Sequence, residues 1–92
     1  MTAKIVVEDN FKVEARKLPP NRRTAAINAL AKFMQEPALP SLKFRPLATK
    51  SGYFIISSAH GDRIILRKLE DNIFAAVDVG PHDNVYRRWN RR

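Results

Sequence analysis

The spacing of apolar positions changes along the chain, and this change divides it into a helical part and a strand part. A short apolar run, 4–7, predicts an edge strand. Residues 9–18 and 21–35 then carry apolar side chains every three to four positions, which is typical of helices with one buried face. A Pro-Pro pair at 19–20 separates them, and Asn21 is a candidate N-cap for the second helix. We therefore expect a helical hairpin.

The second half has the period of strands. Three apolar runs, 53–59, 63–69 and 73–79, are separated by short polar turns, which predicts an antiparallel β-meander. The segment 37–52, which lies before them, contains three prolines and several basic residues, and we expect it to form a loop. Together these elements predict an α+β fold, with a single domain over residues 1–92.

Side-chain alternation assigns faces to the middle strand of the meander. Ile64 and Leu66 point one way, and Arg63, Ile65 and Arg67 point the other. We expect the helices to cover the face of the first pair. Arg63 and Arg67 would then stand about 7 Å apart on an uncovered face.

Composition narrows the function classes. Seventeen Lys and Arg against nine Asp and Glu give a net charge of +8, which favours a polyanionic partner, nucleic acid first and an acidic protein second. The chain has no cysteine and only two histidines, so we expect no metal site and no cofactor. No stretch is long and apolar enough for a membrane span, so we expect a cytoplasmic protein without a membrane partner.

The residues after the last apolar run carry the strongest chemical signal. His82, Tyr86, Arg87 and Arg88 lie within seven residues, directly after Gly80-Pro81. A histidine titrates near neutral pH and can move a proton, whereas arginine stays charged and binds phosphate through a planar fork. RNA can be cut by its own 2′-hydroxyl when an enzyme supplies these groups. The pattern therefore favours metal-free cleavage of RNA.

The order of elements and two motifs resemble the RelE/ParE toxin superfamily. One motif is Gly61-Asp62-Arg63-Ile64-Ile65-Leu66-Arg67, a turn followed by an arginine-bearing strand. The other is Asp78-Val79-Gly80-Pro81-His82-Asp83-Asn84-Val85-Tyr86-Arg87, a strand that runs into a basic tail. The resemblance implies a short N-terminal strand, a two-helix hairpin on an antiparallel meander, and a basic C-terminal tail. It implies a RelE-type toxin of a type II toxin–antitoxin system.

Function and partners follow from the same resemblance. RelE-type members cleave mRNA in the ribosomal A site without a metal, and a cognate antitoxin neutralises them. This chain would then be an endoribonuclease whose partners are mRNA, the ribosome and an antitoxin that is acidic where it meets Arg63 and Arg67. The resemblance places Arg63 at the family's phosphate-contacting arginine, His82 where members carry an arginine or histidine, and Tyr86 at the tyrosine.

We therefore predict His82 as general acid or base, Tyr86 as the residue that orients or stacks on a base, and Arg63 as the phosphate contact. Further RNA-binding residues are predicted on the strand, tail and loop: Arg67, Arg87, Arg88, Lys43, Arg45 and Lys50. The family carries two lysines near positions 54 and 56, where this chain has Phe54 and Ile56. The loop residues would have to supply that charge.

Two alternatives remain open at this stage. ParE-type members share the fold and inhibit DNA gyrase by binding alone, which requires no proton-transfer group. The chain could also be a non-catalytic binding module of a larger protein, which Phe54 and Ile56 favour. The pairing of His82 with Tyr86 favours the nuclease.

Overall fold

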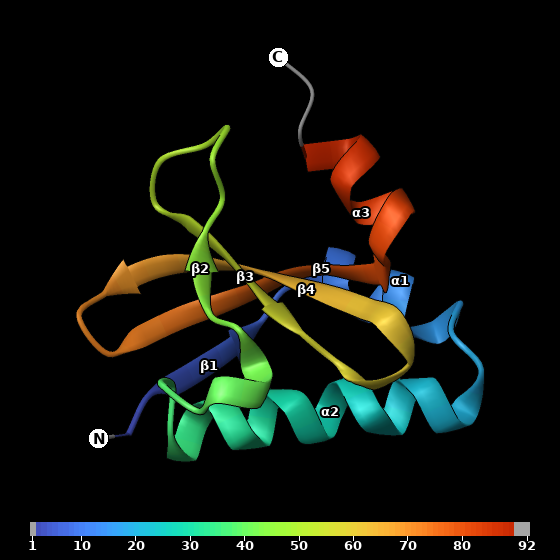
Figure 1. Cartoon of the computed structure of the whole chain (residues 1–92), viewed down its shortest axis with the longest axis horizontal. Helices are drawn as coiled ribbons and strands as arrows, with labels where there is room; N and C mark the ends of the chain where they lie inside the picture. The colour runs from blue at the N-terminus through green and yellow to red at the C-terminus, as the bar shows by residue number, and fades with distance from the viewer. Residues whose placement is uncertain (1, 90–92) are drawn as a thin grey trace.

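The computed structural model describes residues 2–89, which form a five-stranded sheet with α1 and α2 packed on one face and α3 on the other (Figure 1). The elements follow in this order: β1 (Lys4–Val7), α1 (Asp9–Arg16), α2 (Pro20–Gln35), the 3-10 turn η1 (Pro40–Leu42), β2 (Arg45–Pro46), β3 (Tyr53–Ser57), the 3-10 turn η2 (Ala59–Gly61), β4 (Asp62–Glu70), β5 (Ile73–Pro81) and α3 (His82–Trp89). The predicted α+β architecture is confirmed.

The strands lie in the order β1-β5-β4-β3-β2. The run β3–β4–β5 is the predicted antiparallel meander. β1 adds to β5 in parallel, with Lys4 opposite Ile73, and occupies the edge as predicted. β2 closes the other edge, because Arg45 and Pro46 pair with Ile55 and Phe54. The segment predicted as a loop therefore contains a two-residue strand that exists only through its contact with β3.

The helical hairpin is confirmed, but its second helix begins one residue earlier than expected. Pro20 is the first residue of α2 and Pro19 is its N-cap, with no side-chain cap bond. Proline suits the first helical position, because its φ is already helical and its missing N–H would have no partner there. The prediction that Asn21 caps the helix is therefore wrong.

The larger core lies between the sheet and the hairpin, and we call this side of the sheet the helix face. Ile64 and Leu66 are fully buried here, as their alternation predicted. They pack with apolar residues from both helices, among them Phe11, Leu30 and Phe33. Phe33 contacts the Phe74 ring edge-on, with the centroids 5.1 Å apart. The interior of the helix face is thus filled by aliphatic and aromatic side chains.

A second, smaller core lies on the opposite side, which we call the α3 face. Its buried residues are Leu47, Ile55, Ile65, Ala75, Val77 and Val85. The C-terminal segment was expected to be a tail on an uncovered face, but it forms the helix α3. Val85 is buried and Trp89, four residues later, packs against the same core. This spacing places both side chains on one side of a helix, which is why the segment folds onto the sheet.

Within residues 2–89, no helix combines the length and apolar character needed to cross a membrane.

Candidate functional site

The predicted histidine and tyrosine form a contacting pair at the start of α3. His82 is the first residue of the helix and Tyr86 lies one turn later, so both project from the same side. Their ring centroids are 4.3 Å apart. The Tyr86 hydroxyl accepts a hydrogen bond of 3.0 Å from the Arg45 guanidinium on β2. The middle of the chain, through β2, and its C-terminal helix α3 therefore supply a guanidinium, an imidazole and a phenol to one cluster.

The imidazole of His82 is about half exposed and is oriented by its neighbour. Its Nδ1 lies 3.1 Å from the Asp83 carboxylate. When Nδ1–H donates to this carboxylate in the neutral ring, Nε2 keeps a lone pair that can accept a proton. Because the Asp83 side chain is 87% exposed, the contact orients the ring without contributing much stability.

Arg63 lies on the same face, at the start of β4. It is opposite Ser57 of β3 on one side and Gly80 of β5, two residues before His82, on the other. Its Nη1 donates a 3.0 Å bond to the Asp62 carbonyl. This bond holds one side of the guanidinium against the strand, while the group remains only partly buried.

Asp62 anchors this end of β4 to the helix layer. Its carboxylate is fully buried and accepts two hydrogen bonds from the Arg22 side chain of α2. These bonds raise the pKa of Arg22 further above its usual value, with the carboxylate charge adding to the effect. A bidentate pair of this kind fixes direction as well as distance. The strand that carries Arg63 is therefore fixed to α2 at the adjacent residue.

Arg67 shares the α3 face but stands apart from Arg63. Four strand residues at about 3.4 Å each separate the two by about 13–14 Å, so the expected spacing of about 7 Å is wrong. Arg67 donates a 2.8 Å bond to Glu8. This bond raises the pKa of the Arg67 guanidinium. Its predicted role in binding phosphate stays a prediction, and RNA would have to compete with Glu8 for it.

Arg88 forms part of the attachment of α3 to the sheet. Its Nε and Nη2 donate bonds of 2.9 and 3.0 Å to Asp78, whose carboxylate is buried. The same carboxylate accepts a 2.7 Å bond from the Trp89 indole N–H. It also accepts the backbone N–H of Val79. Asp78 is therefore well satisfied, and the predicted phosphate contact of Arg88 would require that pair to open.

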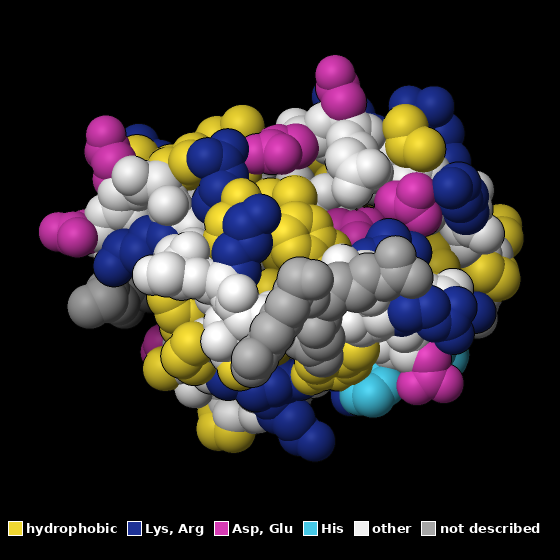
Figure 2. Space-filling view, turned by 90° about the horizontal axis from the view of Figure 1, so that it is seen from above, with side chains coloured by type: hydrophobic (Ala, Val, Ile, Leu, Met, Phe, Trp, Pro, Cys, Tyr) yellow, Lys and Arg dark blue, Asp and Glu magenta, His cyan; other side chains and the backbone are white. Residues whose placement is uncertain are grey.

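The basic loop before β3 lies beside the end of α3. Lys50 Nζ lies 4.8 Å from the centre of the Tyr53 ring and 5.4 Å from that of Trp89, distances typical of cation–π contacts. Thr49 donates a 2.6 Å bond to the Trp89 carbonyl. Lys43 and Arg87 are exposed. Figure 2, viewed from the side on which α3 stands, shows Lys and Arg side chains spread over the surface with acidic groups between them.

The positions expected to replace the family's lysines do not face this surface. Ile56 is fully buried in the helix-face core, and Phe54 packs against that core. A lysine at either position would point towards the helices. Arg45 and Lys50, expected to supply the charge instead, come from the β2–β3 region and contact the α3 face. Among residues 2–89, no cluster of three or more His, Asp and Glu side chains could hold a metal ion.

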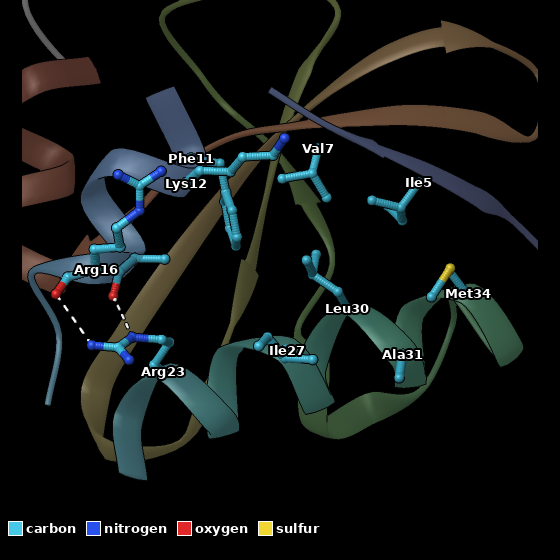
Figure 3. A pocket seen from close by; sticks show the side chains of 11 residues that line it. Ile5, Val7, Phe11, Lys12, Arg16, Arg23, Ile27, Leu30, Ala31 and Met34 are labelled. Atoms are coloured by element: carbon cyan, nitrogen blue, oxygen red, sulfur yellow. Dashed lines mark hydrogen bonds between the residues drawn. The ribbon is translucent and has the colours of Figure 1, made fainter. Parts of the chain in front are cut away.

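A second surface feature is an apolar groove of about 540 Å³ on the other side of the molecule (Figure 3). It is lined by Ile5, Val7, Phe11, Lys12, Ala15, Arg16, Arg23, Ile27, Leu30, Ala31 and Met34. Ile27 is 56% exposed, an unusual degree for an isoleucine beside a core. Arg23 bonds to the carbonyls at the end of α1, whereas Lys12 and Arg16 are exposed at the edge. The groove is thus apolar inside with a positive rim.

The fold matches solved toxin structures over almost the whole chain. A chain of the toxin–antitoxin complex RelBE2 from Mycobacterium tuberculosis superimposes with a TM-score of 0.71 at 20% identity, covering 89% of this chain and 100% of that one. Free E. coli RelE, as a mutant, gives 0.71 at 18% identity, covering 98% and 96%. YafQ of the E. coli DinJ–YafQ complex gives 0.64 at 18% identity, covering 91% and 98%.

No protein-family model and no curated protein matches this sequence. At identities of 20% or less, the structural likeness establishes the fold and not the activity. The chain has the fold of the RelE and YafQ toxins, as the sequence motifs predicted.

Proposed function

We propose that this protein is a RelE-type toxin that cleaves mRNA on the ribosome, without a metal ion, by attack of a 2′-hydroxyl on the adjacent phosphate. The observation that carries the proposal is the contact between His82 and Tyr86, with Arg45 bonded to the tyrosine, on the face that also presents Arg63. An inhibitor that acts by binding alone has no need for a proton-transfer group among its arginines.

The chemistry requires two proton transfers and one charge neutralisation. A base takes the 2′-hydroxyl proton as the 2′ oxygen bonds to phosphorus, and the bond to the 5′ oxygen breaks as that oxygen gains a proton. The products are a 2′,3′-cyclic phosphate and a 5′-hydroxyl. His82 supplies the base or the acid, since its Nε2 is available when Nδ1 is held by Asp83. Arg63 neutralises the charge that develops on the phosphate.

Tyr86 and the remaining cations position the RNA. Stacked against His82, the phenol can pack on a base while Arg45 fixes its hydroxyl. Lys43, Lys50 and Arg87 are exposed and suit contacts to the RNA backbone, which makes binding fall steeply with salt. Arg67 and Arg88 join them only if RNA displaces Glu8 and Asp78.

The test is cleavage of a defined mRNA by protein that has been treated with EDTA and desalted, on the naked mRNA and on programmed ribosomes. Wild type should cut the ribosome-bound mRNA and leave cyclic-phosphate ends. His82→Ala should slow the cut by about 10²–10⁴-fold, the usual contribution of a general acid or base. His60→Asn is the matched control, because His60 lies in the η2 turn at φ 65, a conformation that asparagine tolerates.

Absence of cleavage by wild type in both settings would overturn the nuclease assignment. A gyrase supercoiling assay would then test the ParE-like alternative, in which the same basic face binds a protein and catalyses nothing. Inactivity in that assay too would leave the binding-module alternative.

The proposal includes a cognate antitoxin, as in the RelBE2 and DinJ–YafQ complexes that share the fold. We infer that an acidic amphipathic helix of this partner fills the apolar groove between α2 and β1. The groove offers exposed Ile27 and Met34 to the apolar side of such a helix. Lys12 and Arg16 on its rim suit acidic flanks.

A further inference from the structure

Three buried polar side-chain atoms without a hydrogen-bond partner lie where β3 ends and β4 begins. Among residues 2–89, the buried side-chain atoms without a hydrogen-bond partner are Ser57 Oγ, Ser58 Oγ and Arg63 Nε. The two serines are adjacent at the end of β3, and Ser57 lies directly opposite Arg63 on β4. Folded proteins leave few buried polar atoms unpaired, so two unpaired donors on directly opposed residues point to a missing partner.

The three atoms belong to different faces of the sheet. Ser57 and Arg63 follow the alternation of Ile55 and Ile65, which are in the α3-face core, so their side chains share that face. The extended chain turns Ser58 to the other side. Both serines also border a cavity of about 300 Å³ beside α2, beyond the edge of β3. Only Ser57 can therefore act together with Arg63.

The pairing brings the Ser57 and Arg63 side chains close together. Ser58 N–H donates to the Asp62 carbonyl at 2.9 Å, so the next pair along, Ser57 and Arg63, is the non-hydrogen-bonded one. Opposed side chains approach each other most closely in such pairs, with Cβ atoms about 4.5–5.5 Å apart. The side chains that carry the hydroxyl donor and the Nε–H donor thus project from opposed positions on one face, and the guanidinium that includes Nε is held through Nη1.

We propose that Ser57 is an RNA-binding residue, whose hydroxyl acts with Arg63 Nε–H to hold one phosphate group of the RNA. This inference rests on the proposed function and names its phosphate subsite. A phosphate offers several acceptor oxygens to the two donors, and the net charge of +8 favours such an anion. His82 and Tyr86 lie on the same face, at the end of the strand opposite Arg63, so a neighbouring nucleotide can reach them.

The experiment measures binding without cleavage. An RNA trinucleotide with 2′-O-methyl groups cannot be cut and is titrated into isotope-labelled protein, with inorganic phosphate alone as a second probe. Ser57→Ala should weaken trinucleotide binding about tenfold, the value of one hydrogen bond to a charged group. Ser57→Thr should restore it, and Ser58→Ala, which removes the hydroxyl on the other face, should bind like wild type.

Three results would overturn the inference: no saturable shift at Ser57 and Arg63 in wild type, equal affinities of wild type and Ser57→Ala, or an effect of Ser57→Ala on antitoxin binding alone. Inorganic phosphate that binds as tightly as the trinucleotide, with the same dependence on Ser57, would show a small-anion site unrelated to RNA. Thermal unfolding checks the variants, and Ser57→Ala should not lower the Tm, because its hydroxyl has no partner among residues 2–89.

Cleavage on ribosomes separates this inference from the function it rests on. Wild type that binds through Ser57 but does not cut would defeat the nuclease proposal and leave the phosphate subsite intact. Wild type that cuts while Ser57→Ala binds and cuts equally well would defeat the subsite and leave the nuclease.

Discussion

The two faces of the sheet are built by different means. On the helix face, the larger apolar core fully encloses Phe33, Ile56, Ile64 and Leu66, and the buried carboxylate of Asp62, at the end of β4, bonds to Arg22 of α2. On the α3 face, the apolar core is smaller and the short helix over it is held by a buried carboxylate, Asp78. Apolar packing tolerates approximate shapes, whereas hydrogen-bonded ion pairs fix positions. The helix face thus contributes most of the apolar packing, and on each face one buried carboxylate fixes a helix to the sheet, Asp62 for α2 and Asp78 for α3.

A β-bulge gives the α3 face its polar anchor. Along β4, Ile65 pairs with Asp78 of β5, but the next residue, Leu66, pairs with Ala76. Val77 therefore has no direct partner and is the extra residue of the bulge. Val77 belongs to the α3-face core, and Asp78, the next residue, bonds to α3. Two consecutive residues therefore reach the same face, which regular alternation forbids. The bulge places the anchor of α3 only a few residues from His82.

The largest expected effect comes from breaking the helix face. Phe33→Ala should lower the free energy of unfolding by about 3–5 kcal/mol, because it leaves a cavity beneath Phe74 and Phe44. Chemical denaturation measures it. Met34→Ala, the next residue but 37% exposed, is the control and should cost about 1 kcal/mol or less. Equal losses would show that the buried ring of Phe33 contributes no more to stability than a partly exposed side chain.

A smaller loss should follow from removing the charge that anchors α3. Asp78→Asn weakens the bonds to Arg88 and Trp89, and we expect about 2 kcal/mol, less than for a fully buried pair because Arg88 is partly exposed. Trp89 is the sole tryptophan, so its fluorescence follows α3 while far-UV circular dichroism follows the whole fold. The fluorescence change should come first on heating. Coincident transitions, or an equal effect of Asp71→Asn in an exposed turn, would argue against an independently held helix.

Two glutamate substitutions on α2, one inside the apolar groove and one outside it, test whether the groove binds the proposed antitoxin. Ile27→Glu should weaken binding of the proposed acidic antitoxin helix about tenfold, since it puts a carboxylate into the apolar groove, and the proposed cleavage should be unchanged. Thr24→Glu adds the same charge to α2 outside the groove and should bind like wild type. Calorimetry of the purified pair measures both, and parallel losses in the two variants would remove the groove from the interface.

The smallest effect should come from one hydroxyl on the α3 face. Tyr86→Phe keeps the ring beside His82 but loses the bond from Arg45, so ribosome-dependent cleavage should fall by about three- to tenfold. Tyr53→Phe changes the other tyrosine and should leave the rate unaltered. A loss with Tyr86→Phe as large as that with His82→Ala would instead give the phenol a direct part in proton transfer.

Much of the fold was predictable because its signals are local. Helical spacing identified α1 and α2, and alternation assigned Ile64 and Leu66 to the helix face. β2 was missed because two residues carry no period and the strand forms only by pairing with β3. For α3, the sequence contains one pattern that could have predicted a helix, the four-residue spacing of Val85 and Trp89.

The candidate site was only partly predictable for the same reason. The contact between His82 and Tyr86 follows from a four-residue spacing once the segment is helical. The bond from Arg45 to Tyr86 joins residues 41 apart in sequence, and no local sequence pattern predicts it. Ser57 was overlooked because a lone serine carries no signal until the hairpin register sets it opposite Arg63.

The position of β5 has a consequence for how the molecule comes into being. It lies between β1 and β4, yet residues 73–81 are made after both of its neighbours. During synthesis, β1 therefore has no partner strand until β5, near the end of the chain, has been made. Such distant pairings slow folding because the chain must close a long loop first. A newly made molecule thus spends an interval without its finished sheet, and so without α3 and the proposed site in place, during which a partner already present could meet it first.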